Sequence, residues 1–317
     1  MRGQEISVAA TILALAAALA ATNPQYFAPD NLSDLFLTNV PVLFVALGMT
    51  LVILTGEIDI SVGSVFAVTS VLAGIIAKSG APPFLALFSA CLAGAALGTI
   101  NGALVSYLRI PSIVVTLAAM VALRDALRWS TQGAWIENLP ASFQWMGLSQ
   151  SSYPAVMLIL ALAVSIILSW VLRNVGVGRA IYAIGSNEES ARLAGLNTNA
   201  IKVSVFAVLG ALTGTAAALN SARFNQIPSN TGLGLELKVI ASVVIGGAAV
   251  TGGSGTVLGT VLGVVLMAAI GPALTFWGIN AYWEKAIQGL IILVAITAGT
   301  IRARWPQGAR FAPAEHA

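Results

Sequence analysis

Charged side chains are scarce in this sequence. Only 9% of its 317 residues are Asp, Glu, Lys or Arg, whereas 58% are hydrophobic and the mean hydropathy is +0.91. A water-soluble domain carries about a quarter charged residues, so this chain has too few of them to cover a globule of its size. The composition therefore predicts an integral membrane protein, and it argues against soluble enzymes, nucleic-acid binders and disordered scaffolds.

Cysteine and histidine are almost absent. Cys91 is the only cysteine and His316 the only histidine, which excludes intramolecular disulfides and Cys/His metal clusters. Because the one histidine is the second-last residue of the sequence, we also expect no Ser–His catalytic arrangement. No glycine is followed by lysine, so the Gly-Lys-Ser/Thr phosphate-binding motif of ATPases is missing. We therefore expect no metal site, no catalytic residue and no cofactor on this chain, which cannot power itself with ATP.

Long apolar stretches fill most of the sequence. A membrane-spanning helix needs about 20 apolar residues, and ten stretches approach that length, at approximately 6–22, 36–55, 60–78, 84–106, 110–128, 153–172, 201–221, 236–251, 256–276 and 284–301. The third opens with Glu57, Asp59 and two glycines, which favours a half-helix or a re-entrant segment. The prediction is an all-α polytopic membrane helix bundle of about ten transmembrane helices, with one broken or re-entrant segment.

The first stretch has a second interpretation. Arg2 precedes a short apolar run that ends in Ala18-Leu19-Ala20, a pattern also typical of a cleaved signal peptide. The basic residues favour a span, because nine of the fifteen fall on the inner side when both termini are cytoplasmic. We therefore expect a single transmembrane domain over residues 1–317, with the loop 173–200 in the cytoplasm.

A short helix is predicted within this loop. Ser186, followed three residues later by Glu189, matches a capping box, so a helix should begin near Asn187. Gly195 can end that helix as a C-terminal cap. The apolar residues of this helix are Ala191, Leu193 and Ala194. Its polar residues are Glu188, Glu189 and Arg192. Such a helix is either a solvated connector or an element that docks into a partner protein.

The same loop carries a family resemblance. Glu189-Ser-Ala191 followed by Gly195 resembles the Glu-Ala-Ala-x-x-x-Gly signature of ABC importer permeases. Further segments resemble the ribose-type branch of sugar permeases over residues 35–300, namely 56–64, Asn101-Gly102, 109–112, 178–187, Gly246-Gly247 and 251–255. Within that branch, segments 133–140 and 227–236 resemble the autoinducer-2 and rhamnose import permeases. One departure is Glu57, since ribose-type permeases usually carry a neutral or varied residue there.

The resemblance implies a translocation subunit in a bacterial inner membrane. Its expected partners are a second permease in a homo- or heterodimer, two ATPase domains that hold ATP and Mg²⁺, and a periplasmic sugar-binding protein. The resemblance places the ATPase-docking loop at Ser186, Glu188, Glu189, Ala191, Arg192 and Gly195. The cargo would be a monosaccharide similar to rhamnose or autoinducer-2.

A hydroxylated solute needs hydrogen-bond partners across the hydrocarbon region. The candidate pathway residues are Asp59, Asn101, Asn220, Asn225 and Gln226. Each is also explicable as a packing or capping group, and Asp59 in particular can cap the start of the third span.

The competing function is a secondary carrier driven by an ion gradient. Such a carrier needs buried carboxylates, and Glu57 and Asp59 are the only acids placed deep enough to serve. A membrane enzyme is the weakest alternative, because paired carboxylates facing a His or Lys are missing.

Overall fold

The computed structural model describes residues 2–280 together with 283, 285–287, 289–290 and 293. The predicted tenth span, 284–301, lies mostly outside these residues, as does His316. The helices are α1 (Arg2–Thr22), η1 (Pro24–Phe27), α2 (Pro29–Leu54), α3 (Val62–Lys78), α4 (Pro83–Tyr107), α5 (Ser112–Thr131), η2 (Gln144–Gly147), α6 (Tyr153–Asn174), α7 (Gly176–Ser186), α8 (Glu188–Leu193), α9 (Thr198–Ser221), α10 (Leu235–Ile245) and α11 (Val257–Phe276).

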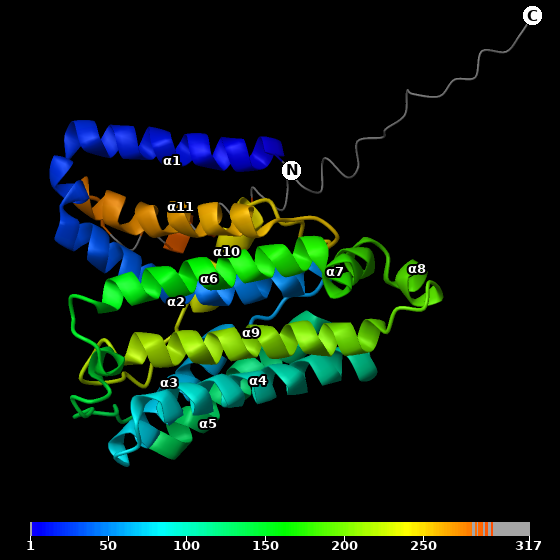
Figure 1. Cartoon of the computed structure of the whole chain (residues 1–317), viewed down its shortest axis with the longest axis horizontal. Helices are drawn as coiled ribbons and strands as arrows, with labels where there is room; N and C mark the ends of the chain where they lie inside the picture. The colour runs from blue at the N-terminus through cyan, green and yellow to red at the C-terminus, as the bar shows by residue number, and fades with distance from the viewer. Residues whose placement is uncertain (1, 281–282, 284, 288, 291–292, 294–317) are drawn as a thin grey trace, which may run out of the picture.

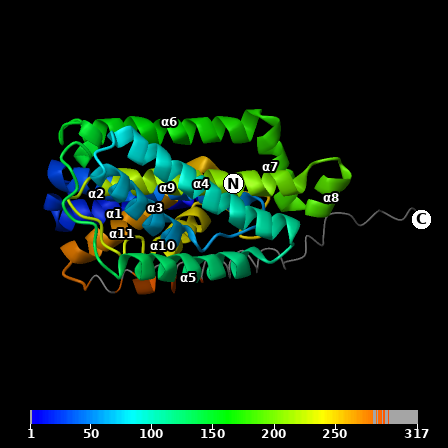
Figure 2. The ribbon, with the colours of Figure 1, turned by 90° about the horizontal axis from the view of Figure 1, so that it is seen from below.

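The long helices run side by side along one axis (Figure 1). Proline occupies one of the first two positions of α2, α4 and α6, where its missing N–H breaks no helical hydrogen bond. The short helix α8 stands at one end of the bundle, which we call the α8 end, and the opposite end is the far end. Seen after a quarter turn, α6 and α5 lie on opposite faces with α2 and α9 between them (Figure 2).

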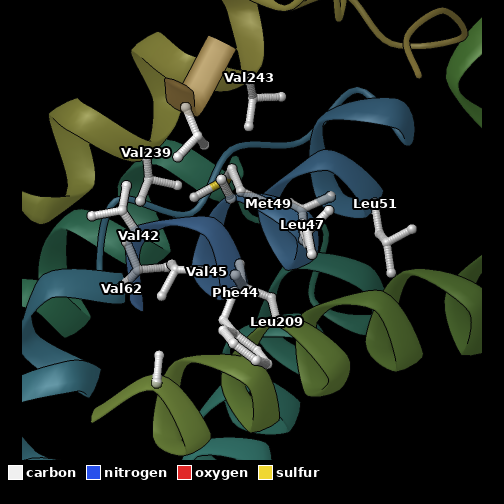
Figure 3. Packing of buried hydrophobic residues seen from close by; sticks show 14 of the residues in the cluster. Val42, Phe44, Val45, Leu47, Met49, Leu51, Val62, Leu209, Val239 and Val243 are labelled. Carbon is white, nitrogen blue, oxygen red and sulfur yellow. The ribbon is translucent and has the colours of Figure 1, made fainter. Parts of the chain in front are cut away.

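Helix α2 forms the centre of the bundle. In its most apolar stretch, 89% of the residues are buried, as expected for a helix that is hydrophobic on all sides. Figure 3 shows side chains of α2, among them Phe44, Leu47 and Met49, packed against Leu209 of α9 and Val239 of α10. By contrast, α1, α4 and α6 leave most of their apolar surface exposed, which fits contact with lipid.

Glycines bring α4 and α9 unusually close together. Gly94 and Gly98 of α4 face Gly210 and Gly214 of α9, and a Cβ on Gly210 would overlap the carbonyl oxygen of Gly94. A similar close approach joins Gly259 and Gly263 of α11 to the end of α10. Small residues at these positions let the backbones pack against each other without side chains between them.

The chain is a polytopic helical membrane protein. Among the described residues, six helices are long and apolar enough to cross a membrane, namely α1, α2, α4, α6, α9 and α11. Helices α3 and α5 are not among these six. Helix α3 has only 17 residues, and α5 has 20 residues but includes the charged residues Arg124, Asp125 and Arg128. The predicted span 236–251 is shorter than expected: α10 ends at Ile245 because the backbone turns at Gly246 and Gly247, where φ is +100° at Gly247.

Helix α1 packs along α11. Leu19 is buried in a cluster with Tyr26 and Ala273, and Trp277 Nε1 donates to Thr22 Oγ1 at 2.9 Å. At the other end of α1, Thr256 Oγ1 donates to Glu5. The start of α1 therefore lies beside the connection between α10 and α11.

Candidate functional site

The connection between α2 and α3, residues 55–61, is non-helical and partly buried. Its backbone N–H groups find partners on α5: Ile58 N–H donates to Ser112 Oγ at 3.3 Å and Ile60 N–H to Thr116 Oγ1 at 3.1 Å. Non-helical backbone at membrane depth is tolerated where it is buried in protein in this way. The sequence predicts a half-helix or re-entrant segment for the third span, and the structure gives that span as the continuous helix α3, preceded by this non-helical connection.

Asp59 lies inside this connection and is only 2% exposed. Its Oδ1 accepts the backbone N–H of Ser61 at 2.7 Å and the Ser61 hydroxyl at 2.6 Å. Asn101 of α4 donates to Ser61 Oγ at 2.9 Å, and its Nδ2 lies 3.5 Å from Asp59 Oδ2. Asp59 therefore holds Ser61, the N-cap residue of α3, but caps no N–H of the first helical turn, and the arrangement brings two candidate pathway residues together.

Lys202 of α9 connects this region to the predicted docking loop. Its Nζ lies 2.7 Å from Glu57 Oε1 and 2.7 Å from Glu188 Oε2. Sequence reasoning did not single out Lys202, because its partners are 145 and 14 residues away along the chain. The signal that could have indicated such a cation is Glu57, an acid in an otherwise apolar stretch.

Helix α8 occurs where the sequence predicts a short helix, with one correction. Its N-cap is Asn187, whose side chain accepts the backbone N–H of Ser190 at 2.8 Å. The predicted capping box on Ser186 is wrong, because a preceding helix, α7, continues through Ser186. Gly195 adopts the left-handed conformation, with φ of +86°, and ends the turn as predicted.

The members of the predicted docking loop differ in exposure. Ala191 is buried, whereas Ser186, Glu188, Glu189 and Arg192 are exposed. A polar cavity of about 630 Å³ opens beside them at the α8 end. Its charged lining residues are Glu57, Arg109, Glu188, Glu189, Arg192 and Lys202.

Two further cavities lie at the far end of α9. One of about 210 Å³ is lined by Asn220 and Gln226, and a neighbouring one of about 590 Å³ shares Asn220. The side chain of Asn225 points elsewhere and accepts from Gln144 Nε2 at 3.4 Å.

The five candidate pathway residues therefore do not form a single site. Asp59 and Asn101 lie together near the α8 end, because the helix turn around Asn101 packs against Val203 and Phe206 of α9. Asn220 lies roughly 22 Å further along α9, at 1.5 Å per residue.

Comparison with known proteins agrees with the motifs. Residues 31–296 match the family model described as branched-chain amino acid transport system, permease component. The chain is 34% identical to the autoinducer 2 import system permease protein LsrC of Photorhabdus laumondii, over 92% of this chain and 88% of that protein. It is 35% identical to LsrC of Yersinia pseudotuberculosis, over 92% and 83% of the two chains.

LsrC of Salmonella typhi is 34% identical, over 94% of this chain and 86% of its own length. No solved structure matches the chain. The family model covers most of the sequence and the similarity extends over about nine tenths of it, which confirms the resemblance to ribose-type importers. The chain therefore belongs to the ABC-importer permeases, in the family described as the permease component of branched-chain amino acid transport systems.

Proposed function

We propose that this chain is the translocation subunit of a bacterial ABC importer for a monosaccharide, and that α8 docks it to a separate ATPase. The observation that carries the proposal is α8 itself, a capped helix of six residues that stands at one end of the bundle and exposes Glu189, Arg192 and Leu193 (Figure 1). Leu193 is 83% exposed, which favours a partner protein over a solvated connector.

The proposed orientation places the α8 end in the cytoplasm of a bacterial inner membrane. A Cβ on Gly247 would contact Gln4, and the glycine-rich turn that follows is tied to the end of α2 by a hydrogen bond from Gly253 N–H to Leu54. The start of α1 thus lies on the same side as α8. Ten spans in one domain over residues 1–317 would return the C-terminus to that side.

The proposed partners follow from this arrangement. One docking helix per permease holds one ATPase domain, and a pair of nucleotide sites needs two such domains, so a second permease completes the complex as a homo- or heterodimer. ATP and Mg²⁺ bind the ATPase, and a periplasmic binding protein delivers the sugar to the far end.

The cargo we propose is a sugar like autoinducer-2, with a rhamnose-like sugar as the alternative. The names of the LsrC relatives support the first. The far-end cavities support a hydroxylated solute, because Asn220 and Gln226 offer amide donors and acceptors there.

An ion-driven carrier fits the geometry less well. Glu57 is paired with Lys202, and Asp59 is engaged by Ser61 and Asn101. The two acids on which that mechanism would depend therefore already have protein partners.

Replacing Gly195 by valine tests the docking function. The left-handed conformation costs a residue with a side chain about 1–2 kcal/mol, which corresponds to a factor of roughly 5–30 in a conformational equilibrium. We expect the amount of ATPase that co-purifies with the permease, and the ATP-dependent uptake, to fall by such a factor.

Two variants control this experiment. Gly195→Asn should retain most of the binding, because asparagine tolerates the left-handed region. Gly176→Val adds the same side chain to another glycine that has open space around it and no positive φ, so it should leave co-purification unchanged. Wild-type ATPase binding and uptake in Gly195→Val would refute the docking assignment.

Replacing Asn220 and Gln226, which line a far-end cavity, by alanine tests the sugar route. A neutral hydrogen bond contributes about 0.5–1.5 kcal/mol, so each single variant should lower uptake by about 2- to 13-fold at limiting sugar. The matched control is Asn174→Ala, since Asn174 is exposed and lines neither far-end cavity. Unaltered uptake and sugar preference in the double variant would place the route elsewhere.

A further inference from the structure

Three elements distant in sequence meet at the Lys202 ammonium group. Glu57 belongs to the connection between α2 and α3, Lys202 to the first turns of α9, and Glu188 is the first residue of α8. The Lys202 side chain is 8% exposed and that of Glu57 is 15% exposed, whereas Glu188 is 45% exposed. The cluster therefore runs from the protein interior to the exposed docking helix.

The Lys202 ammonium group forms ion pairs with two carboxylates, those of Glu57 and Glu188. Both N–O distances are 2.7 Å, so neither acid holds Lys202 more closely than the other. Because hydrogen bonds between charged groups are stronger than neutral ones, the position of Glu188 influences how Lys202 is shared.

Glu57 lies in a connection whose other residues are hydrogen-bonded to neighbouring helices. Two residues further on, Asp59 holds Ser61 at the start of α3 and adjoins Asn101 of α4. Ile58 and Ile60, on either side of Asp59, are held by side chains of α5. The connection 55–61 thus contacts α4 and α5 as well as Lys202, and a shift in it reaches several spans together.

We propose that Lys202 is a positioning residue that couples movement of α8 to the connection 55–61 through Glu188 and Glu57. This inference rests on the proposed docking of α8 to an ATPase. When the ATPase displaces α8, the ammonium group transmits the displacement to Glu57, and the connection moves with it.

The test is hydrogen–deuterium exchange on the complete complex of permease and ATPase, without nucleotide and with ATP plus vanadate. In the wild type we expect nucleotide to change exchange in two segments, 187–197 around α8 and 55–61. If the coupling has the usual size, nucleotide should change the exchange protection of 55–61 in the wild type by roughly 5- to 150-fold. In Lys202→Met, the response of 187–197 should persist while that of 55–61 is lost. Exchange responses need no knowledge of the transported sugar.

Two further variants separate coupling from folding. Lys202→Arg keeps the positive charge and the hydrogen-bond donors, so it should restore the response of 55–61. Glu57→Gln leaves Lys202 its bond to Glu188 and should lose the same response, which keeps the test valid if Lys202→Met does not fold. The control is Lys78→Met, which removes an exposed lysine at the other end of α3.

The outcomes distinguish this inference from the docking proposal. If the ATPase does not co-purify, or nucleotide leaves 187–197 unchanged in the wild type, the docking proposal fails and the inference falls with it. A second outcome is that nucleotide changes exchange in 187–197 but not in 55–61 of the wild type. A third is that nucleotide changes exchange in 55–61 equally in the wild type, Lys202→Met and Glu57→Gln. In either case the docking proposal stands and the coupling through Lys202 is overturned.

Discussion

Replacing Gly210 by leucine should prevent α4 and α9 from packing and so abolish a stable fold. A Cβ on Gly210 would overlap the backbone of Gly94, and Gly98 leaves no room on the other side. Backbone atoms cannot rotate away as a flexible side chain does, so the helices must separate. Overpacking typically costs 1–3 kcal/mol and occasionally more, and we expect about 3 kcal/mol or more here.

The measurement is the yield of folded protein in detergent and its thermal midpoint. Gly3→Leu is the matched control, because Gly3 is also helical and has open space around it. That variant should behave as the wild type, or slightly better, since glycine is a poor helix former. A Gly210→Leu protein with wild-type yield and thermal midpoint would show that α4 and α9 do not pack through their glycines.

Replacing Asp59 by leucine should destabilise the connection between α2 and α3 and stop transport. The change removes the acceptor for the Ser61 N–H and the Ser61 hydroxyl. It also removes the carboxylate oxygen that lies 3.5 Å from Asn101 Nδ2. A buried polar group left without a partner costs about 1–3 kcal/mol. Because Asp59 is itself only 2% exposed, water cannot easily replace the lost carboxylate.

Asp59→Asn distinguishes the hydrogen bonds from the charge. Asparagine keeps an oxygen that can accept the Ser61 N–H, so we expect most of the thermal stability to return. Asp30→Leu is the control, since Asp30 is exposed in the first turn of α2 and contributes at most about 0.3–1 kcal/mol there. Equal thermal midpoints for Asp59→Leu and Asp30→Leu would contradict the role of Asp59 in holding Ser61.

Local patterns in the sequence predicted much of the fold. The stretch 84–106 corresponds to α4 at 83–107, and the turn at Gly195 has the left-handed backbone that its glycine suggested. Both features depend on neighbouring residues alone: an apolar run of sufficient length forms a helix in a membrane, and glycine adopts a positive φ at little cost. The motifs of the loop 173–200 indicated the family for the same reason.

Other boundaries depended on what the neighbouring elements do. Ser186 and Glu189 have the spacing of a capping box, yet α7 extends through Ser186 and the cap falls to Asn187. Helix α10 stops at Ile245 although apolar residues continue to Val250, because the glycines at 246–247 turn the chain. Hydropathy does not distinguish these cases, since it records composition and not the direction of the backbone.

The sequence by itself determined that this is a helical membrane protein, where most of its long apolar helices lie, and which family it belongs to, because those properties follow from composition and short-range spacing. Only the tertiary structure decided that Lys202 joins Glu57 to Glu188, and that Asn101 and Asn220 lie near opposite ends of α9. Ion pairs and cavities form between residues that the chain brings together from far apart. Their positions depend on how the helices pack, which no local pattern contains.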